Sequence, residues 1–560
     1  MLRAPHGVGT TDSTRSQLIK GVAALLVLNA LLSFENWWPS PAIKPDARLA
    51  PEFLLLWVML LVAVKTWGGL PRRLLAALSL GYLALVVGRY ADVTVPGLFG
   101  RNINLYWDGR NIPRFLWVSA QNLPIWLQLA IVAGVASFFW GMYRGLRALI
   151  TVAAREAAPR ALGSRWSLGV TAAAVVLVAA NLAGVKATWP MISKPVIPTY
   201  LRQADLLSTA LSPIRLAQAL PASPPFASDL TSLHGADVQL LFVESYGAMT
   251  FDNPAAYRAL AASREELARR IDASGRQVVS AFVRASTFGG ASDLSHLSLL
   301  SGVDLSDPMR HDLLLTTARP TLTRLFHSHG YETLGFYPAL NWDWPEKAFY
   351  GFDRFYDRRD LDYRGPHFGY WWIPDQVAIA HLEQLAPVRP DSPPRFLFFP
   401  TITSHIPFRP VPPYQPDWSR VATDKPFDDD EVARALADKV DWLDMFPAYV
   451  RMIEYNYRWI GGYLSRPAPR DYLLILVGDH QPASSVSGQG ASWDVPVHVI
   501  SSNPELLGRF VAQGFRPGLE PQRPVLGGMH DLTSILLRAF DGRPLAQDAL
   551  AQARPDGRAR

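Results

Sequence analysis

The sequence contains no cysteine, and this absence excludes several functions at once. A protein without cysteine forms no disulfides, has no zinc site with thiolate ligands and uses no thiol nucleophile. The sequence also lacks a glycine-rich loop ending in lysine, which is the pattern that binds nucleotide phosphates. Basic residues exceed acidic residues only by 54 to 48, without a basic stripe interleaved with aromatics. Nucleic acid is therefore not an expected partner.

Apolar residues are abundant and are concentrated in the first third of the chain. Five long apolar stretches precede residue 190, each near the roughly 20 residues that span a bilayer. They are Leu18–Phe34, Phe53–Trp67, Leu74–Val87, Leu123–Tyr143 and Trp166–Val185. The 18 Trp and 19 Tyr are typical of a protein with a membrane interface. We expect an α-helical transmembrane domain of about five spans over residues 1–186, and a buried soluble helical bundle is the alternative.

The placement of Lys and Arg predicts the orientation in the membrane. The N-terminal tail and the second and fourth connecting loops are basic, which favours the cytoplasmic side for them. The third loop, residues 89–115, is also basic and argues against this orientation; it could be a lid that touches lipid headgroups or an ordinary surface loop. With five spans, everything after about residue 186 lies outside. We therefore expect a multi-pass protein of the bacterial cytoplasmic (inner) membrane with an extracytoplasmic, periplasmic C-terminal domain.

The remainder of the chain divides into three parts. Residues 187–236 are punctuated by proline and predict a juxtamembrane connector, with an amphipathic helix over Tyr200–Leu220. Residues 237–545 alternate between strand and helix patterns, which predicts a doubly wound α/β sheet. The expected strands are Val238–Val243, Val278–Val283, Thr333–Tyr337, Phe396–Thr401, Tyr472–Val477 and Val495–Ile500, and the expected helices include Ala255–Ala273 and Asp429–Leu464. Residues 546–560 predict a disordered tail.

Two of the expected strands end in residue types that bind metals. Tyr472–Val477 is followed by Asp479 and His480, and Val238–Val243 is followed by Glu244. Ligands in open α/β sheets bind where the strands end. Carboxylate oxygen and imidazole nitrogen together suit zinc or manganese. The alternative is an aspartate that caps the next segment beside a surface histidine.

A third segment places a hydroxyl group at the start of a helix. Gly289 and Gly290 precede Ser292, and an amphipathic helical pattern follows it. A helix N-terminus favours a phosphate or an alkoxide, and a metal lowers the pKa of a hydroxyl group and makes it a nucleophile. Thr287 lies before the glycines, so its position favours Ser292 instead. The alternative for Ser292 is an N-cap without a catalytic role.

A glutamate after the first strand, a serine after a glycine-rich turn and a late Gly-Asp-His together resemble the alkaline phosphatase superfamily. Within it, the match is to the sulfatase-like lipoteichoic acid synthases and the related phosphoglycerol and phosphoethanolamine transferases. The resemblance implies one divalent metal ion, zinc or manganese, held by Glu244, Ser292, Asp479 and His480. It also implies that Ser292 is the catalytic nucleophile, a position that is usually threonine in these enzymes.

The same resemblance implies residues that bind substrate. His405, in Thr403–Phe408, occupies the place of a substrate-binding histidine. Trp342 and Trp344 lie in a segment, residues 337–357, that resembles the one carrying headgroup contacts. His530 is expected to support the site or the fold rather than to bind metal.

The function implied is a membrane-bound transferase that moves a phosphorylated headgroup from a phospholipid donor to a cell-envelope glycan or lipid through a phosphoserine. Phosphoethanolamine transferases of this type usually carry disulfides, so the absence of cysteine favours phosphoglycerol. A true sulfatase needs Cys/Ser-x-Pro-x-Arg, and Ser292 is followed instead by Asp-Leu-Ser-His. An extracytoplasmic phosphodiesterase and a non-catalytic membrane scaffold are the alternatives.

Overall fold

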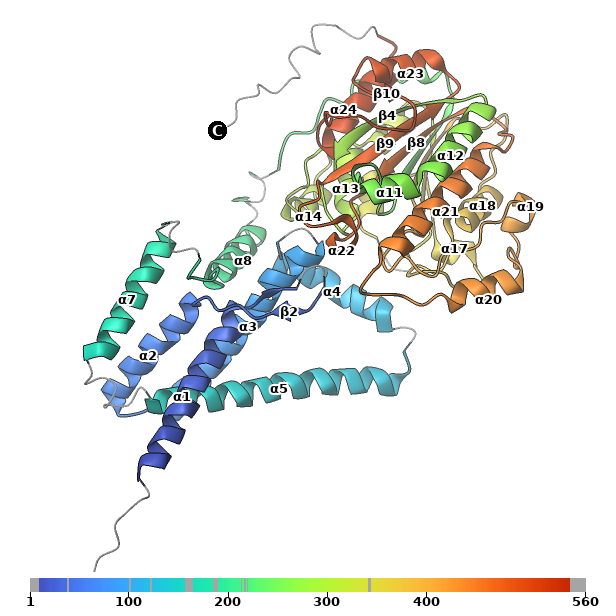
Figure 1. The fold of residues 1–560 in the computed structure, drawn as a ribbon. Helices are drawn as coiled ribbons and strands as arrows, with labels where there is room; N and C mark the ends of the chain where they lie inside the picture. The colour runs from blue at the N-terminus through green and yellow to red at the C-terminus, as the bar shows by residue number, and fades with distance from the viewer. Residues whose placement is uncertain are drawn as a thin grey trace, which may run out of the picture. The chain divides into compact units, whose positions relative to one another are not determined.

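The computed structural model describes most of the chain in two compact units (Figure 1). The described residues are 10–37, 40–99, 102–120, 123–156, 165–183, 185, 190–212, 214–215, 218, 220–340 and 344–543. The first unit comprises residues 1–97 and 101–211, and the second comprises residues 98–100 and 212–560. The expected connector is thus shared between them, with its helix in the first unit. Trp342 and the expected tail lie outside the described residues.

Helices form at all five apolar stretches of the first unit. Its elements are α1 (Thr10–Ser33), β1 (Glu35–Asn36), β2 (Ile43–Lys44), α2 (Pro51–Trp67), α3 (Arg72–Phe99), α4 (Leu105–Ala120), α5 (Ile125–Glu156), α7 (Arg165–Leu182) and α8 (Ile197–Ala210). Two helical segments in the described part of the chain, Arg72–Leu98 and Ile125–Arg155, are long and apolar enough to cross a membrane. Ile19–Ser33 and Thr171–Ala180 are shorter apolar helices, and α2 has 17 residues. The number of five spans therefore stays a prediction.

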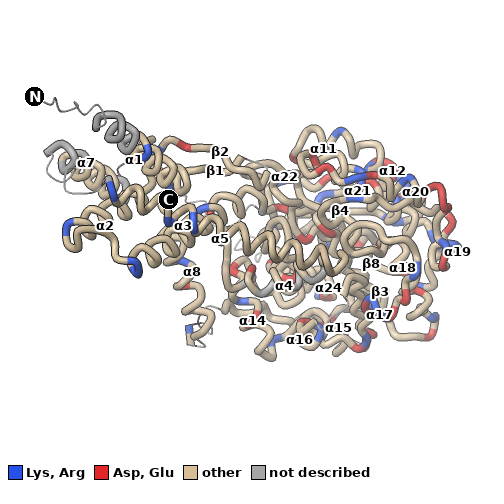
Figure 2. The backbone as a smooth tube through the Cα atoms, turned by 90° about the horizontal axis from the view of Figure 1, so that it is seen from below, with Lys and Arg blue, Asp and Glu red and all other residues tan. Residues whose placement is uncertain are grey.

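Charged residues are sparse on the helices of the first unit and frequent on those of the second (Figure 2). The region expected as a third loop is mostly helical, because α3 continues through it to Phe99 and α4 follows. Arg89 lies on α3 and is buried, donating to the carbonyl oxygens of Phe34 and Lys194 at 2.9 Å each. Arg89 is therefore not an exposed loop charge of the kind that the Lys/Arg bias counts. This weakens the evidence from this basic region against the expected orientation.

Helix α8 is attached to the first unit by buried carboxylates. Glu52 Oε1 accepts from the backbone N–H groups of Val196 and Ile197, at 2.6 and 2.9 Å. Asp92 Oδ1 accepts from the hydroxyl group of Thr199 at 2.7 Å. The first carboxylate satisfies N–H groups that have no partner inside a helix. These contacts make α8 a fixed part of the unit rather than a free linker.

The second unit contains an eight-stranded sheet in the order β10-β4-β9-β8-β3-β7-β5-β6. Its strands are β3 (Asp237–Val243), β4 (Gln277–Arg284), β5 (Glu332–Tyr337), β6 (Arg354–Asp357), β7 (Arg395–Pro400), β8 (Tyr472–Gly478), β9 (Asp494–Ser501) and β10 (Arg516–Pro517). Its helices are η2 (Thr231–Leu233), α10 (Met249–Asp252), α11 (Pro254–Ala259), α12 (Ala261–Ala273), α13 (Asp293–Ser301), α14 (Met309–Leu315), α15 (Leu322–Ser328), α16 (Glu346–Tyr350), α17 (Arg358–Leu361), α18 (Asp375–Leu385), α19 (Trp418–Val421), α20 (Asp429–Ala437), α21 (Phe446–Leu464), α22 (Ser484–Ser487), α23 (Pro504–Val511) and α24 (Met529–Phe540). The six expected strands are all present.

The sheet of the expected α/β domain is mixed, with both parallel and antiparallel strand pairs. Strands β3, β5, β6, β7 and β8 pair in parallel, whereas β9 is antiparallel to β8 and β4. A parallel crossover needs a connection that runs the length of the sheet, usually a helix. Between β8 and β9 there is only α22, with four residues, so the chain turns back at the carboxyl edge. One expectation is corrected, because the helix expected over Asp429–Leu464 is two helices, with Pro447 in the first turn of α21.

Alternate residues of β3 pack on opposite faces of the sheet. Leu241 and Val243 belong to the core that includes residues of α12, α18 and α21. On the other face, the ring of Phe242 lies 4.4 Å from that of His296 on α13. Helices thus cover both faces (Figure 1), and the apolar runs of the central strands follow from burial on both sides.

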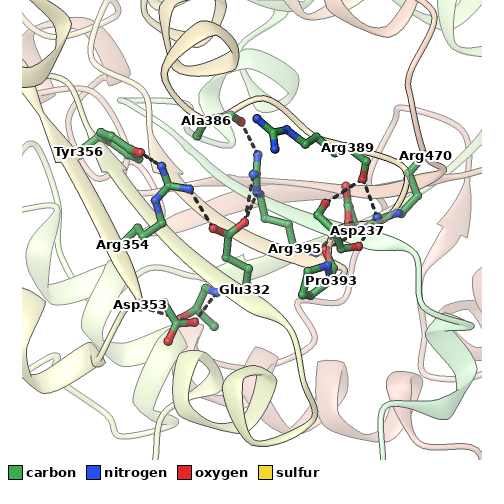
Figure 3. A network of polar contacts seen from close by, with 12 residues as sticks. Asp237, Glu332, Asp353, Arg354, Tyr356, Ala386, Arg389, Pro393, Arg395 and Arg470 are labelled. Carbon is green, nitrogen blue, oxygen red and sulfur yellow. Dashed lines mark hydrogen bonds and ion pairs between the residues drawn. The ribbon is translucent and has the colours of Figure 1, made fainter.

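Arginines and carboxylates link the amino-terminal ends of the strands (Figure 3). Arg395 of β7 donates to Glu332 Oε2 of β5 at 3.1 and 3.3 Å and to the carbonyl oxygen of Ala386 at 2.8 Å. Arg470 donates to Asp237 Oδ1 of β3 at 3.0 Å. This network lies at the edge of the sheet opposite to the ends that carry Glu244 and Asp479, so we assign it to stability.

We expect Arg395→Met to lower the free energy of unfolding by roughly 2–3 kcal/mol, because it removes a nearly buried cation and leaves the Ala386 carbonyl without this donor. Urea unfolding of the wild type and the variant measures the effect. Arg364→Met is the matched control, because Arg364 and Asp362 form an exposed ion pair and the variant should unfold like the wild type. An unchanged unfolding midpoint in Arg395→Met would contradict the role assigned to the network.

Candidate active site

Three side chains that could hold a metal ion converge at the carboxyl edge of the sheet. Glu244 follows β3, and Asp479 and His480 follow β8, its parallel neighbour. All three are buried, and one ligand atom from each lies within 4.8 Å of the others. His480 Nε2 is 3.5 Å from Glu244 Oε1 and 3.6 Å from Asp479 Oδ2. The parallel pairing of two strands is therefore what brings residues 244 and 479 together.

Backbone donors and neighbouring hydroxyl groups fix the two carboxylates. Asp479 Oδ1 accepts from the N–H groups of Ser245 and His480, at 2.8 and 2.7 Å. The Ser245 hydroxyl donates to Glu244 Oε1 at 2.8 Å. Ser245 has a φ of 56°, a left-handed conformation that non-glycine residues rarely adopt. Strain at this position is consistent with a site whose geometry is imposed by its surroundings.

The electrostatics of the cluster favour a bound cation. Burial, and then the charge of Glu244, raise the pKa of Asp479 to about 7. Burial disfavours the charged form of His480, but the carboxylates of Asp479 and Glu244 outweigh it and raise its pKa. A divalent ion would neutralise the two buried carboxylates that otherwise repel each other.

The hydrogen bonding of His480 also fits a metal ligand. Its Nδ1 lies 2.8 Å from the carbonyl oxygen of Gln481, which can only accept, so Nδ1 carries the proton. Nε2 is the nitrogen that faces Glu244 and Asp479, and a backbone carbonyl is a common partner for the far nitrogen of a ligating histidine. The donor set of two carboxylates, one imidazole and one hydroxyl group fits zinc or manganese.

Ser292 reaches this cluster from the segment between β4 and α13. Its Oγ lies 3.2 Å from His480 Nε2 and 3.4 Å from Glu244 Oε2. Ser292 precedes α13 but forms no side-chain capping hydrogen bond, so the N-cap alternative does not describe its hydroxyl group. The other hydroxyl groups nearby have local partners: Thr287 donates to the carbonyl oxygen of Gly290 at 2.7 Å, and Ser286 donates to Ser298 at 2.7 Å.

The turn before Ser292 exposes consecutive backbone donors. Gly289, Gly290 and Ala291 all have positive φ, at 66°, 137° and 62°. In the described part of the chain, the N–H groups of Gly290, Ala291 and Ser292 donate to no protein acceptor. Successive N–H groups in such a turn form a concavity that binds anions. The sequence indicated this feature only through its Gly-Gly pair.

His405 lies after β7, next to β3 in the sheet, and is held by aromatic rings. Its ring stacks on Tyr370 at 4.6 Å and 17°, and Trp371 approaches it edge-on at 5.6 Å. Its Nδ1 donates to the carbonyl oxygen of Ile406 at 2.7 Å. Burial lowers the pKa of His405 to about 4, so the ring is neutral at pH 7 and its Nε2 can accept a hydrogen bond.

The remaining expected residues are less directly connected with the cluster. Trp344 is 3% exposed, and its ring packs against Tyr337, Tyr350 and Phe355. This gives Trp344 a packing role, and its contact with a headgroup stays a prediction, as does that of Trp342. His530 lies 3.5 Å from Asp531 and forms no hydrogen bond to the cluster within the described residues.

Several supporting residues could not be recognised from the sequence. Ser404 donates to the carbonyl oxygen of Glu244 at 2.6 Å and accepts from Asn456 at 2.9 Å. Asn456 is a buried polar residue in the middle of α21, which was the one available signal.

His296 is buried one turn after Ser292, and neither ring nitrogen has a hydrogen-bond partner in the described chain. Burial, and then the charge of His480, lower the pKa of His296 to about 3.

The last residue of β8 should tolerate no side chain. A Cβ at Gly478 would lie 1.9 Å from the carbonyl oxygen of Tyr246. We expect Gly478→Ala to displace the Asp479–His480 turn and to lower metal affinity at least tenfold, or to cost roughly 3 kcal/mol of stability. Calorimetric metal titration and urea unfolding measure the two effects. Gly508→Ala on α23 is the control, since its Cβ would meet nothing within 4 Å. A Gly478→Ala variant with wild-type values in both would refute this geometry.

A mixed sheet with helices on both faces, and a carboxylate–histidine–serine cluster at its carboxyl edge, is the arrangement of an α/β enzyme domain. Residues 240–499 match the family model described as Sulfatase. This region of the chain is therefore similar to sulfatases, and the expected resemblance to sulfatase-like proteins is confirmed. No curated protein matches the chain.

Several solved structures are similar to the chain at low identity. The lipoteichoic acid synthase LtaP from Listeria monocytogenes is 12% identical, with a TM-score of 0.35, over 60% of this chain and 77% of that one. The Streptococcus pyogenes phosphoglycerol transferase GacH in complex with sn-glycerol-1-phosphate is 13% identical, with a TM-score of 0.34, over 60% and 82%. The C-terminal periplasmic domain of EptC from Escherichia coli is 13% identical, with a TM-score of 0.31, over 48% and 73%.

Proposed function

We propose that the protein is a membrane-bound, metal-dependent transferase that moves a phosphorylated headgroup from a phospholipid donor to a hydroxyl group of a cell-envelope glycan or lipid. Ser292 is the nucleophile, and Glu244, Asp479, His480 and Ser292 hold one divalent ion, zinc or manganese. The observation that carries the proposal is the position of the Ser292 hydroxyl group, within 3.4 Å of both Glu244 and His480. Phosphoglycerol is the favoured headgroup, and phosphoethanolamine is the other candidate.

The reaction has two displacements at one phosphorus atom. The metal, when bound, lowers the pKa of the Ser292 hydroxyl group and offsets phosphoryl charge. Ser292 Oγ attacks the phosphorus, the bond from phosphorus to the diacylglycerol oxygen breaks, and diacylglycerol takes up a proton as Ser292 releases one. An acceptor hydroxyl group then attacks the same phosphorus, its proton is released, and Ser292 regains a proton when the Ser292–phosphate bond breaks.

Residues of this chain would orient the substrate in both steps. The N–H groups of Gly290, Ala291 and Ser292, which donate to no acceptor in the described chain, can bind the phosphoryl oxygens. The neutral His405 can accept a hydrogen bond from a hydroxyl group of the headgroup or the acceptor. The three N–H groups belong to the turn that ends at Ser292. His405 follows β7, which is next to β3, and both loops lie at the carboxyl edge of the sheet.

The first unit supports a lipid donor. It contains two segments that are long and apolar enough to cross a membrane, together with shorter apolar helices. We propose five spans, with the sulfatase-like domain on the extracytoplasmic side of a bacterial cytoplasmic membrane. A domain tethered there has lipid headgroups as its nearest phosphate esters, whereas the sequence shows no nucleotide-binding loop.

The test uses the detergent-solubilised full chain with labelled phosphatidylglycerol or phosphatidylethanolamine. We expect diacylglycerol to be released from one of the two, phosphatidylglycerol being favoured, and no release by Ser292→Ala. Label recovered on an added hydroxyl acceptor supports transfer, whereas label recovered only as free headgroup phosphate supports the phosphodiesterase alternative. Release from neither lipid would contradict the proposed donor.

A further inference from the structure

One partly buried arginine at the carboxyl edge of the sheet has no acidic partner among the residues that the structure describes. Arg358 follows β6 directly, and β6 is parallel to β5. In the described part of the chain, no carboxylate forms an ion pair or hydrogen bond with its side chain. The adjacent Asp357 pairs with Arg359 instead. Burial lowers the pKa of Arg358 and no acidic group raises it, although the guanidinium stays charged at pH 7. A partly desolvated cation of this kind can bind an anion.

An aromatic ring holds the guanidinium of Arg358 in place. Its Cζ lies 3.7 Å from the centre of the Trp372 ring, and His367 stacks on that ring at 4.0 Å and 9°. The guanidinium of Arg358 and the ring of His367 are both too close to the Trp372 ring to lie on the same face of it. They therefore lie on opposite faces, with the Trp372 ring between them. Trp372 also has a φ of 75°, which a bulky residue rarely adopts. Stacking on a ring leaves the N–H groups at the guanidinium edge available to a ligand.

The loop that carries Trp372 also reaches the candidate active site. Tyr370, two residues earlier, stacks on His405. Asp375 fixes the end of this loop, because its carboxylate accepts from the N–H groups of Ile402 and Thr403 at 2.7 and 3.0 Å. Arg358 itself donates its backbone N–H to the carbonyl oxygen of Leu340 at 3.0 Å. Arg358 therefore adjoins the segment of residues 337–357 and the loop whose Tyr370 contacts His405.

We propose that Arg358 binds a substrate phosphate other than the phosphoryl group that is transferred. The planar guanidinium matches two phosphate oxygens at once, which an ammonium group cannot do. The inference rests on the proposed function and extends it, because it makes one substrate carry a second phosphate. That phosphate belongs either to the acceptor or to a donor lipid with two phosphates.

Kinetics of three variants distinguish these two sources. In Arg358→Gln we expect KM to rise roughly ten- to a hundredfold for a phosphorylated substrate, because a charge-assisted hydrogen bond is lost. If the acceptor carries the phosphate, KM rises for sn-glycerol 3-phosphate but not for glycerol. If the donor carries it, KM rises for cardiolipin but not for phosphatidylglycerol. Arg358→Lys should recover part of the loss. Arg354→Gln is the control, because Arg354 also lies over an aromatic ring, that of Tyr356, but has Glu332 as its acidic partner (Figure 3).

A binding measurement tests the site without requiring turnover. Calorimetric titration of the metal-loaded protein with inorganic phosphate should show two sites in the wild type and in Arg354→Gln, and one in Arg358→Gln. Equal site numbers in all three, or KM values that rise equally for phosphorylated and neutral substrates, would overturn the inference and leave Arg358 a packing residue. Failure of the proposed function would appear differently, as no diacylglycerol from any lipid, and the titration would still decide about Arg358.

Discussion

Replacing Ser292 by alanine is expected to lower the transfer rate by at least roughly 10⁴-fold, because the chemistry then lacks its nucleophile. The fold should be unaffected, since the Ser292 hydroxyl group caps no helix and its partners among the described residues are members of the cluster. Metal affinity should fall by a few fold at most, because Glu244, Asp479 and His480 are unchanged. Steady-state kinetics, metal titration and urea unfolding measure the three quantities.

Two other hydroxyl groups provide the comparison for this variant. Ser301→Ala removes a hydroxyl group from α13, where it donates to the carbonyl oxygen of Leu297, and should retain full activity. Thr287→Ala removes the bond to the Gly290 carbonyl oxygen and should only weaken activity through the turn. Full activity in Ser292→Ala together with loss in Thr287→Ala would show that Thr287 is the nucleophile.

Replacing Asp479 by asparagine is expected to have opposite effects on metal binding and on stability. Metal affinity should fall more than about 100-fold, since loss of even an outer partner of a ligand costs 10- to 100-fold. The metal-free fold should gain roughly 1–3 kcal/mol above pH 7, because asparagine removes a buried charge that burial and Glu244 disfavour. Asparagine can still accept from the N–H groups of Ser245 and His480 at Oδ1.

The pH dependence of this gain follows from the direction of the shift. The native Asp479 carboxyl group has a pKa of about 7, above the ordinary value of 3.8, so the native state binds the proton more tightly than the unfolded state does. Stability of the metal-free wild type should therefore decline as pH rises from about 4 through about 7. The difference between Asp479→Asn and the wild type should be absent below pH 4 and complete above pH 7. Urea unfolding at pH 4, 6 and 8, with metal removed, measures it.

Asp375→Asn is the matched control for Asp479→Asn. Asp375 is also fully buried, and burial raises its pKa to about 6. Both of its oxygens accept backbone hydrogen bonds, so asparagine loses one acceptor and should destabilise the fold while metal affinity is retained. Undiminished metal affinity in Asp479→Asn would contradict the assigned ligand set.

The central strands could be predicted from the sequence because burial on both faces leaves a continuous apolar run. β3 and β8 begin and end within a residue of their expected bounds. The edge strands β6 and β10 were not expected, since they have only four and two residues. The antiparallel direction of β9 could not be predicted from the sequence either. Side chains alternate between the two faces of a sheet whether a strand runs parallel or antiparallel to its neighbours.

The grouping of Glu244, Asp479 and His480 could be anticipated because parallel strands bring their carboxyl ends to one edge. The sandwich of Arg358, Trp372 and His367 could not, because it depends on how the loop after α17 folds back onto the end of β6. The aromatic triplet Tyr370–Trp372 was the available signal in the sequence. A local sequence pattern does not predict which other ring an aromatic side chain will contact in the folded protein.

The phosphoserine is the central claim of this account, and mass spectrometry tests it directly. Metal-loaded wild type is incubated with phosphatidylglycerol, without acceptor, then acid-quenched and digested. We expect the mass of a phosphoglycerol group on the peptide that contains Ser292, and no such adduct in Ser292→Ala. An adduct on another residue, or release of diacylglycerol by the wild type with no adduct on any peptide under single-turnover conditions, would contradict Ser292 as the nucleophile.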